Sequence, residues 1–242
     1  MNIAAIVVAA GNGERLGAGV PKALVSLGGR PLYEWAAAAF LDHSDISSLV
    51  IVAPESVVAE VEQRLGGGVR VISGGATRQE SVSRGLQTLP DEVEYVLVHD
   101  AARPLVPSSV ISDVIAVLRG GARAVIPVLP VADTIKRVDP DGKVAATVDR
   151  APLRSVQTPQ GFQRAALVSA HAEAAALGDA GTTDDAGLLE AMGLEVMTVA
   201  GSELGFKITT AHDLKIAEAL IQTVDVASAV KSEPAQAAGG GR

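Results

Sequence analysis

Two cations and several glycines lie together on one short segment near the N-terminus, residues 7–22 (VVAAGNGERLGAGVPK). Arg15 and Lys22 supply fixed positive charge, and the small residues around them let the backbone approach a ligand and present its N–H groups. This combination suits a polyphosphate, because cations and N–H donors both stabilise phosphate oxygens. An ordinary glycine-rich turn between a strand and a helix is the alternative interpretation.

Two familiar glycine motifs do not match this segment. A dinucleotide fingerprint GxGxxG beginning at Gly11 requires glycine at position 16, where the chain has Leu16. The Walker phosphate loop requires Gly-Lys-Ser/Thr, but Pro21 precedes Lys22 and Ala23 follows it. The first mismatch disfavours a dehydrogenase, and together they indicate a phosphate loop of another kind.

A second glycine-rich turn, GGATR at residues 74–78, follows another apolar run. A helix is predicted over 80–89, with Ser81 in its first turn beside Arg78. Glycines at the carboxyl end of a buried strand again indicate a ligand site, because open parallel sheets bind ligands at that edge. A simple connection between a strand and a helix is the alternative.

A third cluster, HDAARP at residues 99–104, ends the predicted strand 95–99. A carboxylate at this position, Asp100, can hold a hydroxyl group or Mg²⁺, and Arg103 three positions later can contact a phosphate. The alternative for Asp100 is an N-cap for the next helix. We interpret His99 as a packed strand residue rather than a base.

Composition restricts the possible functions. The chain has 242 residues, 48% hydrophobic residues, no cysteine and a net charge of −8. Absence of cysteine excludes disulfides, thiolate metal sites and a cysteine nucleophile. The negative charge argues against non-specific binding to nucleic acid or to an anionic membrane. Phosphorylated substrates would need a local cluster of cations. With no long apolar run, we expect a soluble, cytoplasmic protein.

Short apolar runs alternate with helical segments, which predicts an α/β domain with a parallel sheet and crossover helices. The predicted domain covers residues 1–225, and residues 226–242 are predicted to be a disordered tail. Predicted strands are 3–9, 49–52, 69–72, 95–99, 124–131, 195–200 and 206–209, and predicted helices are 31–41, 54–65, 80–89, 107–119, 163–177, one ending at 192, and 211–223.

One segment interrupts this alternation. Residues 133–138 and 143–148 flank Asp139-Pro140-Asp141-Gly142, which predicts a β-hairpin arm over about 132–155. An exposed hairpin with apolar residues commonly needs a partner surface, so we expect the arm to form a dimer contact.

These motifs, taken in order, resemble the 2-C-methyl-D-erythritol 4-phosphate cytidylyltransferases of the non-mevalonate isoprenoid pathway. The resemblance extends from residue 3 to about residue 221. It rests on AAGNGERLGAGVPK, GGATRQESV, VLVHDAARP, DTIKR, TVDR, QTPQGF, TDDA and FKIT. It implies a single Rossmann-like nucleotidyltransferase domain, a homodimer joined by the hairpin arms, and Mg²⁺ with CTP. The implied reaction attaches CMP to methylerythritol phosphate and releases pyrophosphate.

The resemblance also implies roles for individual residues. Arg15, Lys22 and Lys207 are expected to be catalytic, through positive charge on phosphate oxygens. Residues expected to bind the nucleotide are Ala9, Ala10, Gly11, Gly13, Gly75, Ser81, Asp100 and Ala101, with Asp100 also expected to bind the metal. Residues expected to bind the sugar phosphate are Arg103, Thr134, Arg150, Thr158, Thr183 and Lys207, of which Thr134 and Arg150 would come from the partner's arm.

Two alternatives remain at this stage. A cytidylyltransferase for another polyol phosphate, such as ribitol 5-phosphate, would share the nucleotide loops and differ around Arg150, Thr183 and Lys207. A nucleotide-binding module without turnover is the alternative of a different class. The combination of Arg15, Lys22 and Asp100 argues against it, because binding alone does not require cations at the α-phosphate. For Thr183 and Asp184, helix capping alone is the alternative role.

Overall fold

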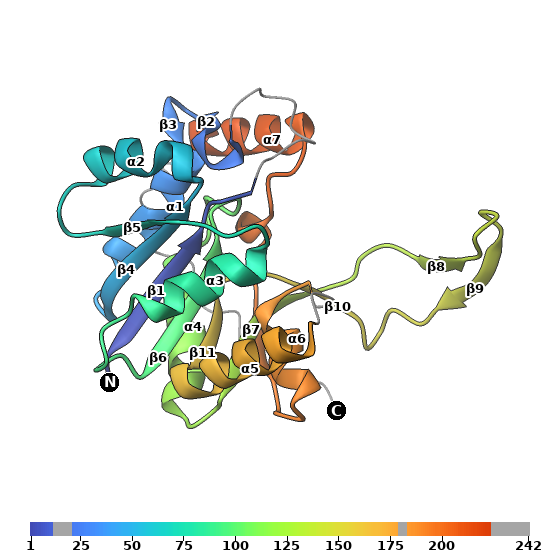
Figure 1. Ribbon diagram of the computed structural model, residues 1–242. Coiled ribbons are helices and arrows are strands. Elements are labelled where there is room, and N and C mark those ends of the chain that lie inside the picture. Colours follow the sequence, from blue (N-terminus) through green and yellow to red (C-terminus); the bar gives the residue numbers. More distant parts are fainter. Residues whose placement is uncertain (12–20, 179–182, 224–242) are drawn as a thin grey trace.

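The computed structural model describes residues 1–11, 21–178 and 183–223, which form an α/β domain with helices on both faces of a central sheet (Figure 1). Four parallel neighbours run in the order β5-β4-β1-β6, and β11, β7 and β10 extend the sheet in antiparallel pairings. β12 adds a parallel pairing with β7. The predicted fold class is therefore confirmed. The strand bounds are β1 Ile3–Val8, β4 Ile46–Ala53, β5 Arg70–Ser73, β6 Tyr95–Asp100, β7 Ala124–Pro130, β10 Arg154–Val156, β11 Gln160–Gln163 and β12 Met197–Ala200.

The central strand β1 is buried on both faces, which explains its uninterrupted apolar sequence IAAIVV. Ile3, Ala5 and Val7 belong to one core cluster, whereas Ala4 and Ile6 belong to the other. The first face is covered by α1 (Leu32–Leu41), α2 (Val58–Leu65), preceded by the 3-10 turn η3 (Glu55–Val57), and α4 (Ser108–Arg119). The second face is covered by α3 (Arg78–Gln87), α5 (Arg164–Leu177) and α6 (Asp185–Ala191).

A third, smaller cluster lies beside the carboxyl ends of the central strands. It combines the short pair β2 (Ser26–Leu27) and β3 (Arg30–Pro31) with α7 (Ala211–Thr223). The 3-10 turn η2 (Lys22–Leu24) leads into this region. The cluster holds the segment 206–209 against the sheet, because Ile208 is fully buried within it.

The predicted strand 206–209 is wrong. The structure has a 3-10 turn, η4 (Glu203–Gly205), followed by residues that pair with no strand. Phe206 and Ile208 alternate as strand residues do, but they pack in the third cluster, and the Ile208 N–H bonds to the carbonyl of Ala102. The pattern of alternating apolar residues was correct for burial but not for sheet pairing.

The predicted hairpin arm is present. β8 (Ile135–Val138) and β9 (Val144–Val148) form a two-stranded sheet of their own, which projects away from the domain (Figure 1). The turn closes through a bond from the Asp139 N–H to the Lys143 carbonyl, and Gly142 adopts a φ of +81° that glycine tolerates. The predicted tail, 226–242, lies outside the described residues. None of the described helices is long and apolar enough to cross a membrane.

Candidate functional site

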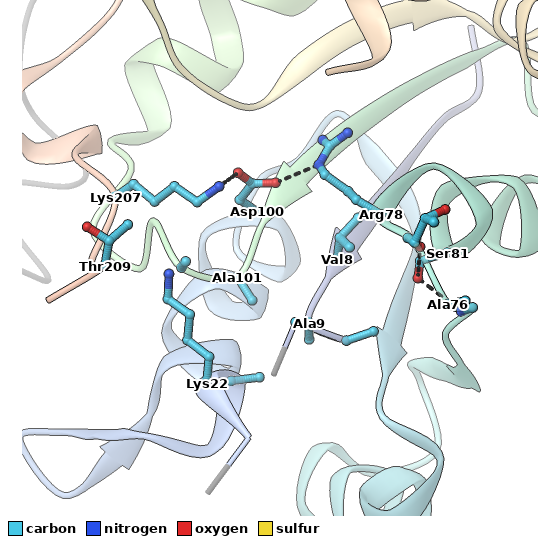
Figure 2. Close-up of a pocket in the computed structure, with 16 residues that line it drawn as sticks. Val8, Ala9, Lys22, Ala76, Arg78, Ser81, Asp100, Ala101, Lys207 and Thr209 are labelled. Carbon is cyan, nitrogen blue, oxygen red and sulfur yellow. Dashed lines mark hydrogen bonds and ion pairs between the residues drawn. The ribbon is translucent and has the colours of Figure 1, made fainter. Parts of the chain in front are cut away.

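A cavity of about 660 Å³ opens at the carboxyl ends of β1 and β6, where α3 begins and where η2 and the segment before α7 meet the sheet (Figure 2). Parallel strands bring their carboxyl ends to one edge, so loops from distant parts of the sequence converge there. The lining comprises Val8, Ala9, Ala10, Gly11, Lys22, Ala23, Gly75, Ala76, Thr77, Arg78, Ser81, Asp100, Ala101, Ala102, Lys207 and Thr209.

Most of the predicted nucleotide and catalytic residues meet in this cavity. They are Ala9, Ala10, Gly11, Lys22, Gly75, Ser81, Asp100, Ala101 and Lys207. Gly13 and Arg15 lie outside the described residues. The charged part of the described lining has three cations, on Lys22, Arg78 and Lys207, against one carboxylate. The cavity is thus locally positive in a chain of net charge −8.

Asp100 is held between two of these cations. Its Oδ1 accepts a bond from Arg78 Nε at 3.1 Å, and its Oδ2 accepts one from Lys207 Nζ at 2.8 Å (Figure 2). Burial by itself would raise the pKa of Asp100, but the charges of Arg78 and Lys207 hold that pKa well below its ordinary value. Asp100 is therefore ionised at neutral pH. It is not an N-cap, because Pro107 precedes α4 without a side-chain cap.

Arg78 was not among the predicted site residues. It opens α3, whose N-cap Thr77 accepts a bond from the Glu80 N–H. Besides Asp100, it contacts Asp185 at the start of α6, with Nη1 at 2.6 Å from Oδ2. Arg78 was identified at the end of the GGATR turn, but it was given no role in the site. Its partner Asp185 lies 107 positions further along the chain, so only the folded chain could identify the pair.

The turn before α3 is fixed by side chains of the same helix. Ser81 Oγ accepts from the Gly75 N–H at 3.0 Å and donates to the Thr77 carbonyl at 2.9 Å. The Ala76 N–H bonds to Glu80. A side chain at Gly74 would collide with Ala10 and Ser81, so glycine is required where this turn approaches the end of β1. This wall of the cavity is thus held by hydrogen bonds within the turn and the first turn of α3.

Thr158 lies behind the cavity rather than in its lining. Its hydroxyl accepts from the Asp100 N–H at 3.1 Å and lies 2.9 Å from His99 Nδ1. His99 is fully buried, and burial lowers its pKa to about 4. It is a neutral, packed strand residue, as predicted. Thr158 therefore supports the end of β6 from within the domain.

Arg103 also contacts backbone rather than the described cavity lining. Its Nη1 donates to the Gly205 carbonyl at 2.8 Å, and its Nη2 donates to the Val156 carbonyl at 3.2 Å. It therefore ties the segment that carries Lys207 to the strand by which the arm returns to the sheet.

The remaining predicted sugar-phosphate residues are not brought to the cavity of their own chain. Thr134 and Arg150 lie at the two sides of the arm, and both are exposed. Thr183 is exposed just before α6, where Asp184 caps the helix by accepting from the Gly187 N–H at 3.1 Å. Capping is thus confirmed for Asp184.

An α/β sheet with a cationic cavity at its carboxyl edge is typical of proteins that bind phosphorylated ligands there. The family model for 2-C-methyl-D-erythritol 4-phosphate cytidylyltransferase (IspD) matches residues 3–223. A protein of that name from Frankia casuarinae is 50% identical over 95% of this chain and 85% of its own. Another from Rhodococcus opacus is 49% identical over 91% and 95%, respectively.

Solved structures agree. The 2-C-methyl-D-erythritol 4-phosphate cytidylyltransferase from Thermus thermophilus is 39% identical, with a TM-score of 0.78 over 92% of this chain and 100% of that chain. The 4-diphosphocytidyl-2C-methyl-D-erythritol synthase from Anaerococcus prevotii is 30% identical, with a TM-score of 0.80 over 91% and 98%. The chain belongs to the 2-C-methyl-D-erythritol 4-phosphate cytidylyltransferase family, and it is a nucleotidyltransferase, as its motifs predicted.

Proposed function

We propose that this chain transfers CMP from CTP to 2-C-methyl-D-erythritol 4-phosphate, releasing pyrophosphate, and that the transfer takes place in the cavity at the ends of β1 and β6. The observation that supports this most strongly is the set of three cations on three separate segments of the chain around one cavity. A volume of about 660 Å³ is in the usual range for a small-molecule site. Family membership supports the identity of both substrates.

The main obstacle to the reaction is charge. A phosphate nucleophile and a triphosphate repel each other, and the transition state adds charge to the non-bridging oxygens of the α-phosphate. Cations fixed in the cavity before the substrates arrive lower this barrier without reorganising during the reaction. Lys22 and Lys207 both line the cavity, Lys22 with its amino group extended from η2 and Lys207 with its amino group beside Asp100 (Figure 2), so both are placed to contact phosphate oxygens.

No general base is needed for this chemistry, because the attacking phosphate is already ionised. The described lining contains no histidine. His99, which directly precedes the lining residue Asp100 in the sequence, is buried in the strand and bonded to Thr158 and to the Arg103 carbonyl. The described residues of the cavity therefore act through charge and positioning.

We also propose that Mg²⁺ acts with CTP in this cavity. Among the described residues, no group of three or more His, Cys, Asp or Glu side chains is placed to bind a metal ion. Each Asp100 oxygen accepts one bond and keeps a lone pair. This donor fits an ion that takes one protein ligand and its other ligands from phosphates and water. Bound there, Mg²⁺ would neutralise part of the triphosphate charge.

We propose further that the chain forms a homodimer through its arms. An isolated two-stranded hairpin is marginally stable in water, yet β8 and β9 form a separate sheet. Val138 and Val144 on these strands are 57% and 62% exposed. A second copy packed against the arm would cover them. Thr134 and Arg150 would then reach the partner's cavity, where we propose that both bind the sugar phosphate.

The test is pyrophosphate release by the full chain with CTP and Mg²⁺, using methylerythritol 4-phosphate and, in parallel, ribitol 5-phosphate. We expect release with the first sugar phosphate only. Release with ribitol 5-phosphate alone would contradict the proposed acceptor, and release with neither would contradict a catalytic function. The cytoplasmic location expected from the sequence stays a prediction.

A further inference from the structure

A series of contacting charged and titratable side chains extends from the cavity into the interior of the domain. Lys207 contacts Asp100, Asp100 contacts Arg78, Arg78 contacts Asp185, and Asp185 contacts His171. Lys207, Asp100 and Arg78 line the cavity, whereas Asp185 and His171 are buried outside its lining. The inner members of this series, Asp185 and His171, have no role in the reaction described above.

The inner end, at Asp185 and His171, is buried and hydrogen-bonded. The side chains of Asp185 and His171 are 1% and 4% exposed, and His171 Nε2 donates to Asp185 Oδ1 at 3.0 Å. Burial alone would raise the pKa of Asp185, but the charge of Arg78 and the bond from His171 lower it below the ordinary value. Asp185 is thus a buried anion that depends on these partners.

Gln160 fixes Asp185 to the central sheet. Its side chain on β11 donates to Asp184 Oδ2 at 2.7 Å and accepts from the Ala186 N–H at 3.2 Å, on either side of Asp185. Because Gln160 is itself buried, the start of α6 cannot shift without breaking both bonds. Arg78 therefore binds to an anchor that belongs to the core.

Arg78 connects this anchor to the cavity through different nitrogen atoms. Nη1 lies 2.6 Å from Asp185, and Nε lies 3.1 Å from Asp100. A planar guanidinium can make both contacts at once in a fixed geometry, which a lysine amino group cannot reproduce. The Asp185 contact thereby sets where the Asp100 carboxylate lies, and Asp100 in turn binds Lys207 (Figure 2).

We propose that Arg78 is a positioning residue for the cytidylyl transfer: anchored by the buried Asp185–His171 pair, it holds Asp100 and, through it, Lys207 in place for the substrates. This inference rests on the proposed function. Without Arg78, Asp100 would pair with Lys207 alone and keep that cation from the phosphates. Turnover should then fall more than nucleotide affinity.

The experiment must separate positioning from folding, because Arg78→Met leaves Asp185 buried without its partner. The double variant Arg78→Met/Asp185→Asn removes both charges. Steady-state pyrophosphate release, the Kd for CTP and the Tm are measured on the full chain. The matched control is Arg119→Met, which breaks an Arg–Asp pair with Asp45 outside the cavity lining. Asp185→Asn and Arg78→Lys complete the set.

We expect Arg78→Met to lower both the Tm and kcat, the latter about tenfold or more. The double variant should regain the Tm but not kcat, while the Kd for CTP stays within about threefold of wild type. Arg78→Lys should recover part of kcat, Asp185→Asn should lower kcat less than Arg78→Met, and Arg119→Met should turn over normally.

Wild-type kcat in the double variant, or in Arg78→Met, would overturn the proposal. A Kd for CTP that rises as much as kcat falls would also overturn it, because Arg78 would then bind the nucleotide directly. If the double variant does not fold, wild-type kcat in both Asp185→Asn and Arg78→Lys would be the overturning result. No pyrophosphate release by wild type would instead refute the proposed function.

Discussion

The cavity and the hairpin arm differ in how their polar side chains are positioned. In the cavity, Asp100 and Arg78 have partners within the same chain, from strands and helices far apart in sequence. On the arm, Thr134 and Arg150 are exposed, and the strands between them form a sheet separate from the main one. The nucleotide end of the proposed site is thus organised by one chain, whereas in the proposed homodimer the sugar end would depend on a second copy.

This difference has a physical cause. A parallel sheet covered on both faces has a fixed edge, so side chains there are positioned by the core behind them. A two-stranded arm has no core of its own and is ordered by what it packs against. Variants in the cavity should therefore affect catalysis directly, and variants on the arm should act through assembly or through the acceptor substrate.

The largest effect is expected in the cavity. Lys22→Ala should lower kcat by a factor of about 10² or more, with smaller changes in KM, because its charge acts mainly in the transition state. Steady-state pyrophosphate release measures both constants. Lys215→Ala, an exposed lysine on α7, is the matched control and should retain normal turnover. Near-normal kcat in Lys22→Ala would refute the catalytic role of this cation.

The next effect concerns the arm as a contact surface. Val138→Lys combined with Val144→Lys should produce monomers and lower activity roughly 30-fold, since charges would enter the proposed apolar contact and the arm residues would leave the partner's site. Sedimentation velocity and pyrophosphate release measure the two consequences. Val168→Lys, at an exposed valine on α5, should change neither. A fully active monomer would contradict the proposal that activity depends on the arm of a second copy.

A narrower change tests which substrate the arm contacts. Arg150→Ala should raise KM for methylerythritol 4-phosphate about tenfold by removing a phosphate contact, with little change in KM for CTP. Initial rates with each substrate varied at saturating levels of the other provide the two values. If KM for CTP alone changed, the arm would belong to the nucleotide end of the site.

The smallest effect concerns the helix behind Lys207. Thr210 and Asp213 form a capping box at the start of α7, and Asp213 also accepts from Thr209, a residue of the cavity lining. Asp213→Ala should lower the free energy of unfolding by about 1 kcal/mol at pH 7, measured by urea denaturation.

The pH dependence of this effect has a defined sign. Hydrogen bonds to its carboxylate lower the pKa of Asp213 from its ordinary value of 3.8 to about 2, and the bond from the Thr209 N–H is the largest cause. Its stabilising contribution is therefore complete above pH 4 and disappears as the pH falls toward 2. The difference between wild type and Asp213→Ala should shrink over that range, and a constant difference would contradict the capping role.

The sequence predicted most of the elements and much of the cavity. Residues 3–9 were predicted as a buried strand, because IAAIVV is apolar throughout, and β1 confirms it. The turn around Gly142 was predicted from Asp139-Pro140-Asp141-Gly142 between two strand-like runs, and β8 and β9 confirm it. Prediction failed at residues 206–209, where Phe206 and Ile208 alternate as in a strand but pack beside α7. Periodicity reports which side chains are buried, not what buries them.

The sequence by itself determined the parallel strands β1, β4, β5 and β6, the glycine turns and the cations that follow, because these depend on local conformation and on residue type. Only the tertiary structure decided which charges meet. Asp100 is shared between Arg78 and Lys207, the latter 107 positions away, and Arg78 is anchored by Asp185. Pairing between side chains so far apart is set by the order of strands and helices around the sheet, which no local pattern encodes.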